Sequence, residues 1–162
     1  MICMKLSIRK GLGFGLTSGI ITTLGLIIGL GSSTDSKLVV IGGILIIAVS
    51  DALSDALGIH ISEEFENKHT VREIWESTVF TFLSKFVFAL TFVLPTLLLS
   101  LPVAILVSTI WGLSLIIGFS YYIAKQGGAR PFKVILEHLV IVIVVIIATF
   151  YLGKWVKATF PA

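Results

Sequence analysis

Five mostly apolar stretches divide this chain, and they constrain its fold more than any other feature. They cover about residues 11–30, 38–61, 78–99, 102–124 and 132–156. Roughly 20 apolar residues in a helix cross the hydrocarbon core of a bilayer. Only 13% of the 162 residues are charged, whereas a soluble domain has about 25%. The sequence therefore predicts a single all-α domain over residues 1–162, an integral membrane bundle of five transmembrane helices.

The connections and the N-terminal segment refine this prediction. The segment LPTLLLSLP joins the third and fourth stretches, and Pro95 and Pro102 bracket it. Each proline restricts the residue before it, so we expect a tight helical hairpin there. The first stretch is too long for a signal-peptide core and lacks a convincing cleavage site, so we expect it to remain as a span. The single cysteine, Cys3, excludes an internal disulfide and is expected to be an unpaired thiol.

Basic residues predict the orientation, because lysine and arginine are concentrated in cytoplasmic loops. Eight of them fall on one side of the predicted spans and three on the other. The first group is Lys5, Arg9, Lys10, Lys68, Arg72, Lys125, Arg130 and Lys133, and the second is Lys37, Lys154 and Lys157. We therefore expect a cytoplasmic N-terminus and an outward C-terminus. Short loops indicate a prokaryotic plasma membrane, and a net charge of +3 is too small to predict a nucleic-acid partner.

Two carboxylates interrupt the second apolar stretch, in the segment SDALSDAL at residues 50–57. Asp51 and Asp55 are one helical step apart and project within about 40° of each other. An ionised aspartate at the centre of a bilayer costs at least about 2.5–3.5 kcal/mol, and such residues often mark ion or proton pathways. We therefore predict an ion or proton site. The alternative is a structural salt bridge to Lys85, about eight residues into the third stretch.

The polar line continues from this pair toward the cytoplasmic mouth. Ser62 and Glu66 fall close to it and Glu63 lies at its edge, so Ser62 is predicted to line the pathway and the two glutamates to gather cations. The alternative is a solvated extension of the helix. Carboxylates without thiolates favour hard divalent cations. No phosphate-binding loop, CxxC pair or nucleophile–base set is present, so we do not expect an enzyme or a resident cofactor.

Small residues mark the first stretch, where Gly11, Gly15 and Gly19 form consecutive GxxxG steps. Such steps let helices approach closely in lipid. Two interpretations are open, namely packing inside one bundle and the seam of a homodimer. The second would bring the acidic stripes of two copies together and supply four carboxylates to one cation.

Taken in order, several segments resemble the vacuolar iron transporter family over most of the chain. They are TSGIITTLGLIIGL at 17–30, ALSDALGIHIS at 52–62, FALTFVLPTLLL at 88–99, and GGARPFKVILEHLVIVIVVIIATFYLGKWV at 127–156. The resemblance implies five spans, a homodimer, and an iron or manganese path lined by the first two spans, with proton exchange. Ser18 stands where the family has an aspartate, and Asp55 where it has a methionine. The family's long cytoplasmic helical domain is absent.

These inferences predict a divalent metal cation transporter of the iron and manganese kind, with proton coupling left open. Asp51 and Asp55 would bind the cation or carry protons, and Ser18 and Thr22 would supply oxygens along the path. The expected partners are the lipid bilayer, divalent cations, protons and a second copy of the chain. The alternative is a membrane scaffold or partner subunit that transports nothing, in which Lys85 neutralises the aspartate pair.

Overall fold

The computed structural model describes residues 5–160, and 91% of these residues are helical. The helices are α1 Leu6–Thr34, α2 Lys37–Glu66, α3 Val71–Thr91, α4 Val93–Leu98, α5 Leu101–Gly127 and α6 Pro131–Thr159. Five units are long and apolar enough to cross a membrane, with α3 and α4 together forming the third. The prediction of an all-α chain with five candidate spans is confirmed. Cys3 lies outside the described residues.

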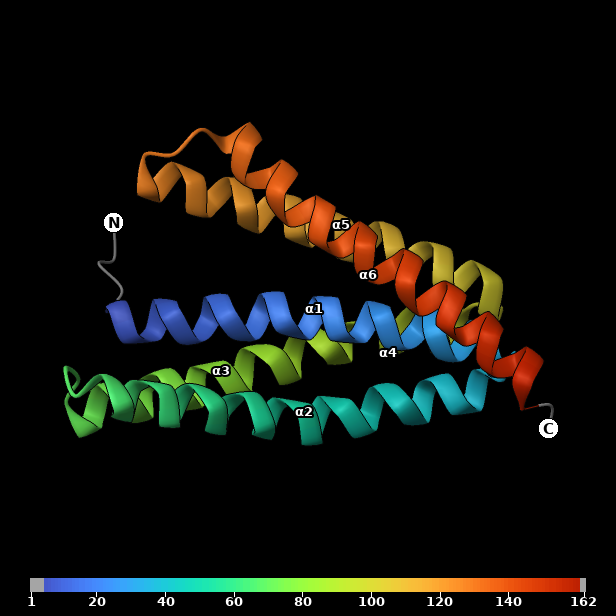
Figure 1. The fold of residues 1–162 in the computed structure, drawn as a ribbon, viewed down its shortest axis with the longest axis horizontal. Coiled ribbons are helices and arrows are strands. Elements are labelled where there is room, and N and C mark those ends of the chain that lie inside the picture. Colours follow the sequence, from blue (N-terminus) through green and yellow to red (C-terminus); the bar gives the residue numbers. More distant parts are fainter. Residues whose placement is uncertain (1–4, 161–162) are drawn as a thin grey trace.

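The helices run alternately along the long axis of the bundle (Figure 1). The start of α1, the α2–α3 connection and the α5–α6 connection lie at one end, which we call the N-terminal end. The basic residues expected on one side of the membrane belong to these segments, and Lys37, Lys154 and Lys157 belong to the opposite end. The grouping of basic residues therefore agrees with the fold, while the orientation in a membrane stays a prediction.

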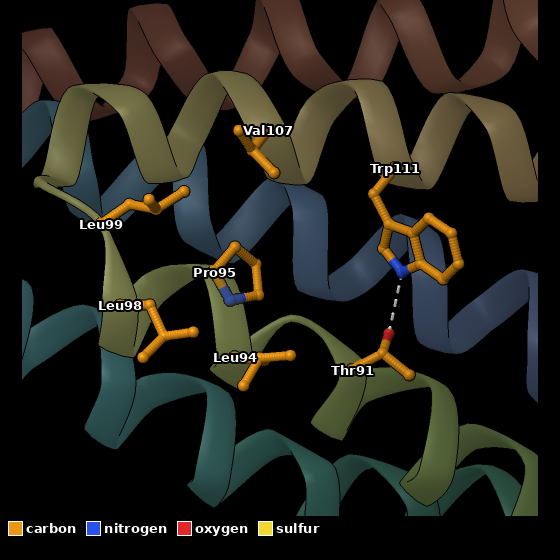
Figure 2. A pocket seen from close by; sticks show the side chains of 7 residues that line it. All are labelled: Thr91, Leu94, Pro95, Leu98, Leu99, Val107 and Trp111. Carbon is orange, nitrogen blue, oxygen red and sulfur yellow. Dashed lines mark hydrogen bonds between the residues drawn. The ribbon is translucent and has the colours of Figure 1, made fainter.

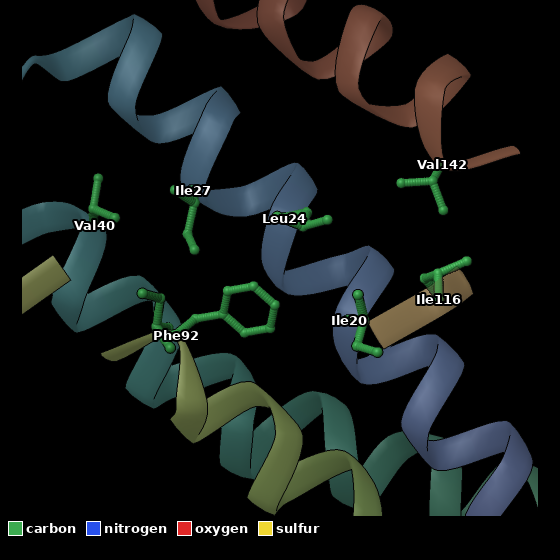
Figure 3. Close-up of a cluster of buried hydrophobic side chains, with 8 residues drawn as sticks. Ile20, Leu24, Ile27, Val40, Phe92, Ile116 and Val142 are labelled. Carbon is green, nitrogen blue, oxygen red and sulfur yellow. The ribbon is translucent and has the colours of Figure 1, made fainter. Parts of the chain in front are cut away.

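Helix α1 is the centre of the bundle and contacts α2, α3, α5 and α6. Its residues Ile20, Leu24 and Ile27 are fully buried. They form one apolar cluster with residues of the other helices, namely Val40, Ile44, Phe92, Ile116 and Val142 (Figure 3). The outer helices are correspondingly apolar on their exposed faces, as expected where lipid replaces water.

The glycine stripe of α1 packs against α3 within the same chain. A Cβ atom added to Gly11 or Gly15 would overlap the carbonyl oxygen of Ser77 or Thr81, respectively. At Gly19 the added atom would lie 3.0 Å from the Lys85 carbonyl oxygen. Small residues permit this backbone approach, which is how helices gain packing contacts in lipid. The structure thus favours the internal interpretation. Because α3 covers these glycines, they are not free to form a dimer seam in this arrangement, and association of two copies stays a prediction.

The third candidate span is interrupted at residue 92, between α3 and α4. Pro95 has no N–H to donate to the carbonyl group four residues earlier, which belongs to Thr91. The side-chain hydroxyl of Thr91 accepts a hydrogen bond from Trp111 Nε1 at 3.1 Å, which ties α3 to α5 (Figure 2). Only residues 99 and 100 separate α4 from α5. The predicted tight hairpin is therefore confirmed, and an apolar groove lies beside it.

Candidate ion site

The turn between α2 and α3 places Asp55 opposite Lys85. Helix α2 is capped at its C-terminus by Asn67, which has a left-handed backbone with φ of 50°. Helix α3 begins with a capping box, in which Thr70 and Glu73 each satisfy a backbone N–H of the other. By residue count Asp55 lies roughly 17 Å before the turn and Lys85 roughly 21 Å after it. Helical side chains lean toward the N-terminus, so the ammonium group reaches back to the level of the carboxylate.

One ammonium group bridges both aspartates. Lys85 Nζ lies 2.6 Å from Asp55 Oδ2 and 2.5 Å from Asp51 Oδ2. It also lies 2.9 Å from Ser18 Oγ, and that hydroxyl donates to Asp55 Oδ2 at 2.6 Å. We call Ser18, Asp51, Asp55 and Lys85 the charge cluster. Lys85 is therefore the counter-ion of both carboxylates, as the alternative interpretation of the sequence expects.

The two carboxylates are not equivalent. Asp55 accepts hydrogen bonds from both Lys85 and Ser18. Asp51 Oδ2 is close to the ammonium group, but the geometry does not meet the requirements of a hydrogen bond, and this oxygen is buried without a hydrogen-bond partner among the described residues. Asp51 is therefore the carboxylate of the cluster with fewer hydrogen bonds.

The charge of the cluster does not balance when both carboxylates are ionised. Two negative charges then face one positive charge, which leaves a net charge of −1 beside the fully buried stem of Lys85. A bound proton or a second cation would restore neutrality. An uncompensated charge inside a bilayer costs free energy. The surplus negative charge therefore enables the cluster to bind a proton or a cation, which a balanced ion pair would not do.

The cluster opens toward the outer face of α2. The side chains of Asp51 and Asp55 keep 31% and 21% of their surface exposed, while that of Lys85 keeps 1%. A line of small exposed residues runs along the same helix at four-residue spacing. We call it the α2 stripe, and it consists of Ser50, Ser54, Gly58 and Ser62. A carboxylate that faces the hydrocarbon of a bilayer costs free energy, so in a membrane this face of α2 must contact water or another helix.

Neither predicted glutamate joins the cluster. Glu63 is 3% exposed and accepts a short hydrogen bond from Ser77. Its other partner is Lys10, 3.6 Å away. Glu63 follows Ala56 by one heptad, so it shares the buried face of α2 rather than the polar line. Glu63 therefore has its partners within the chain, and its role at a mouth stays a prediction. The helical spacing of residues predicts that Glu63 lies at the edge of the polar line of α2. It does not predict that α1 and α3 cover this edge through Lys10 and Ser77.

The remaining predicted residues have different surroundings. Glu66 is exposed and lies 3.1 Å from His69 Nε2, so its contact is local. Thr22 donates to the carbonyl oxygen of Ser18 at 2.9 Å and lines a groove between α1 and α6. Ser62 is exposed on the α2 stripe. Of the predicted pathway residues, only Ser18 is brought to the aspartates. The sequence argument missed Lys10 and Ser77 as partners of Glu63.

No metal-binding group is complete within one chain. Residues 5–160 contain no cluster of three or more His, Cys, Asp or Glu side chains placed to hold a metal ion. Hard divalent ions take about six oxygen ligands, and the charge cluster offers two carboxylates and one hydroxyl. A single protomer therefore provides a site suited to one positive charge, which Lys85 now supplies. A divalent cation would need further ligands and a displaced ammonium group.

No model of a known protein family matches this chain, and no curated protein matches it in sequence. The similarity of its motifs to vacuolar iron transporters therefore stays a prediction from the sequence.

Proposed function

We propose that this chain is an integral membrane cation transporter in which the charge cluster exchanges cations or protons. The observation that carries the proposal is the bridging of two carboxylates of a candidate membrane span by one ammonium group, at 2.6 Å and 2.5 Å. A purely structural ion pair needs one carboxylate. The second carries a surplus negative charge that binding of a proton or cation would neutralise.

The direction of the exposed surface supports the same proposal. The carboxylates, and not the ammonium group, retain access to the outer face of α2. A cation arriving along the α2 stripe would meet Asp51 first, because its side chain is the more exposed of the two carboxylates. Lys85 would then move away from the incoming charge, since like charges repel at such short distances. Coupling to protons follows if a proton leaves the carboxylates when the cation binds.

Transport of a divalent ion requires a second copy of the chain in this proposal. Two facing α2 stripes would bring four carboxylates together, which approaches the oxygen count of a hard divalent site. The exposed small residues of the α2 stripe permit close helix approach. Iron and manganese are the proposed cargo because the sequence motifs resemble metal transporters. The proposed setting is a prokaryotic plasma membrane with the N-terminus in the cytoplasm.

The test is metal flux into proteoliposomes, with a panel of divalent cations and a pH-sensitive dye inside the vesicles. Wild-type protein should accumulate at least one divalent cation and move protons with a fixed ratio. Asp55→Asn should abolish both signals while leaving a folded protein. Glu137→Gln is a matched control, because Glu137 is an exposed carboxylate on α6, whereas the charge cluster lies on α1, α2 and α3. Normal flux in Asp55→Asn would contradict the proposal.

A second function is favoured by one observation, the burial of Lys85 between both aspartates. It is a membrane scaffold or partner subunit that transports nothing, with the charge cluster holding α1, α2 and α3 together. This alternative predicts no flux of any cation in the wild type. It also predicts that loss of either aspartate lowers stability without any other effect.

A further inference from the structure

A second surface feature lies away from the charge cluster, between α1 and α5. These helices separate toward the N-terminal end of the bundle (Figure 1). A cavity of about 440 Å³ opens between them. Its α1 wall contains Leu6, Arg9, Lys10, Leu12, Gly13 and Leu16, and its α5 wall contains Phe119, Tyr122 and Ile123. We call this cavity the α1–α5 groove.

The α1–α5 groove has a basic end and an apolar floor. Arg9 and Lys10 are its charged residues, and no acidic residue lines it. Lys10 is turned toward α2 and α3, where it lies 3.6 Å from Glu63. The exposed side chain of Arg9 makes no hydrogen bond or ion pair with any residue in 5–160. Arg9 is therefore the available positive charge at this end of the groove.

The dimensions match one leaflet of a bilayer. From Leu6 to Leu16 the helix rises roughly 15 Å, which is about half of the 30 Å hydrocarbon core. Gly13 lies against the ring of Phe119 in the middle of the groove, where an added Cβ atom would be in van der Waals contact with the ring at 3.4 Å. Any longer side chain at this position would occupy the groove itself.

We infer that the α1–α5 groove binds an anionic phospholipid, with its phosphate on Arg9 and one acyl chain along Gly13 and Leu16. Charge complementarity selects this occupant, since an unpaired guanidinium above an apolar groove matches a phosphate above an acyl chain. Basic pockets between transmembrane helices on the cytoplasmic side bind anionic headgroups in this manner. The bound lipid fills the space between α1 and the α5–α6 pair.

The experiment measures lipid retained by purified protein in native mass spectrometry. The protein is incubated in mild detergent with equal amounts of phosphatidylglycerol and phosphatidylcholine. Wild type should retain phosphatidylglycerol in preference, at one molecule per protomer. Glycerol 3-phosphate, which has the phosphate but no acyl chain, should neither bind nor raise the melting temperature.

Two variants remove the proposed contacts separately. Arg9→Gln should weaken phosphatidylglycerol binding by about fivefold, the effect expected of one basic residue near an anionic surface. Gly13→Leu should abolish binding of both lipids in the groove, because leucine fills it. The matched controls are Arg130→Gln and Gly118→Leu. Arg130 is an exposed cation at the same end, and Gly118 has open space around it on α5.

The controls should retain phosphatidylglycerol as wild type does. An equal loss in Arg9→Gln and Arg130→Gln would show general surface attraction and overturn the inference. Retention by Gly13→Leu would overturn it also. If Gly13→Leu does not fold, Arg9→Gln with its control decides the matter alone. These results are independent of metal flux, so they do not depend on the proposed transport function.

Discussion

Gly19 lies directly against the backbone of Lys85, where a Cβ atom would come within 3.0 Å of the carbonyl oxygen and 3.2 Å of Cα. The close approach of α1 to α3 therefore sets the position of the ammonium group. Ser18, the neighbour of Gly19, then reaches both Lys85 and Asp55. The packing of Gly11, Gly15 and Gly19 against α3 therefore also determines where the charged groups of the cluster lie.

Gly15→Ala should destabilise the bundle strongly. Its Cβ atom would overlap Thr81 O and Ser84 Oγ, and lie 3.1 Å from Lys85 N. A backbone atom cannot move aside as a side chain can, so α1 and α3 must separate, at a cost of about 1–3 kcal/mol. Thermal melts in detergent measure the effect. Gly42→Ala is the control, because nothing lies within 4 Å of its added Cβ atom. Equal melting temperatures for the two variants would refute the packing described here.

Lys85→Met should lower the free energy of unfolding by about 3–5 kcal/mol, because two carboxylates lose their buried counter-ion. Adding Asp51→Asn and Asp55→Asn to this variant should restore most of that loss, since no uncompensated charge remains. The measurement is the free energy of unfolding of each variant in detergent, combined in a multiple-mutant cycle. Additive effects, with no coupling between Lys85 and either aspartate, would contradict the bridging geometry.

The two aspartate substitutions should differ in stability. Asp55→Asn replaces a carboxylate that accepts hydrogen bonds from Ser18 and Lys85. Asp51→Asn replaces one whose Oδ2 atom has no hydrogen bond and leaves the Asp55–Lys85 pair electrically balanced. We expect Asp55→Asn to melt at a lower temperature than Asp51→Asn, and Asp51→Asn to match or exceed wild type. The reverse order would show that Asp51 is the principal partner of Lys85.

The sequence predicted the apolar architecture well because hydrophobic length is a local property. Five stretches of sufficient length correspond to five helical units long and apolar enough to cross a membrane, and the Pro95–Pro102 segment forms a tight hairpin. Lys85 was identified as a counter-ion from its depth alone, which the rise per residue of a helix fixes.

Rotation and coverage of the helices were less predictable. Gly11 and Gly15 carry a motif that serves packing within a chain and between chains equally well, and only the position of α3 distinguishes the two. The sequence favours a cation-binding role for Glu63, because no residue near it in the sequence predicts that Lys10 and Ser77 contact it. Long-range contacts of this kind depend on how each helix turns about its axis, and apolar residues all around a membrane helix conceal that angle.

The α2 stripe, and not the glycines of α1, should form the contact between two copies of the chain. In a background that carries Cys3→Ser, Ser54→Cys should form a disulfide-linked dimer in membranes, because facing stripes would bring the two Cα atoms within about 7 Å. Gly118→Cys is the matched control, since it lies on the exposed surface of α5 away from the stripe. Ser54→Leu should shift the protein to monomer in mild detergent and abolish divalent flux together, because a larger side chain separates the four carboxylates. A protein that transports fully as a monomer, or that cross-links through Gly118→Cys instead, would exclude this arrangement.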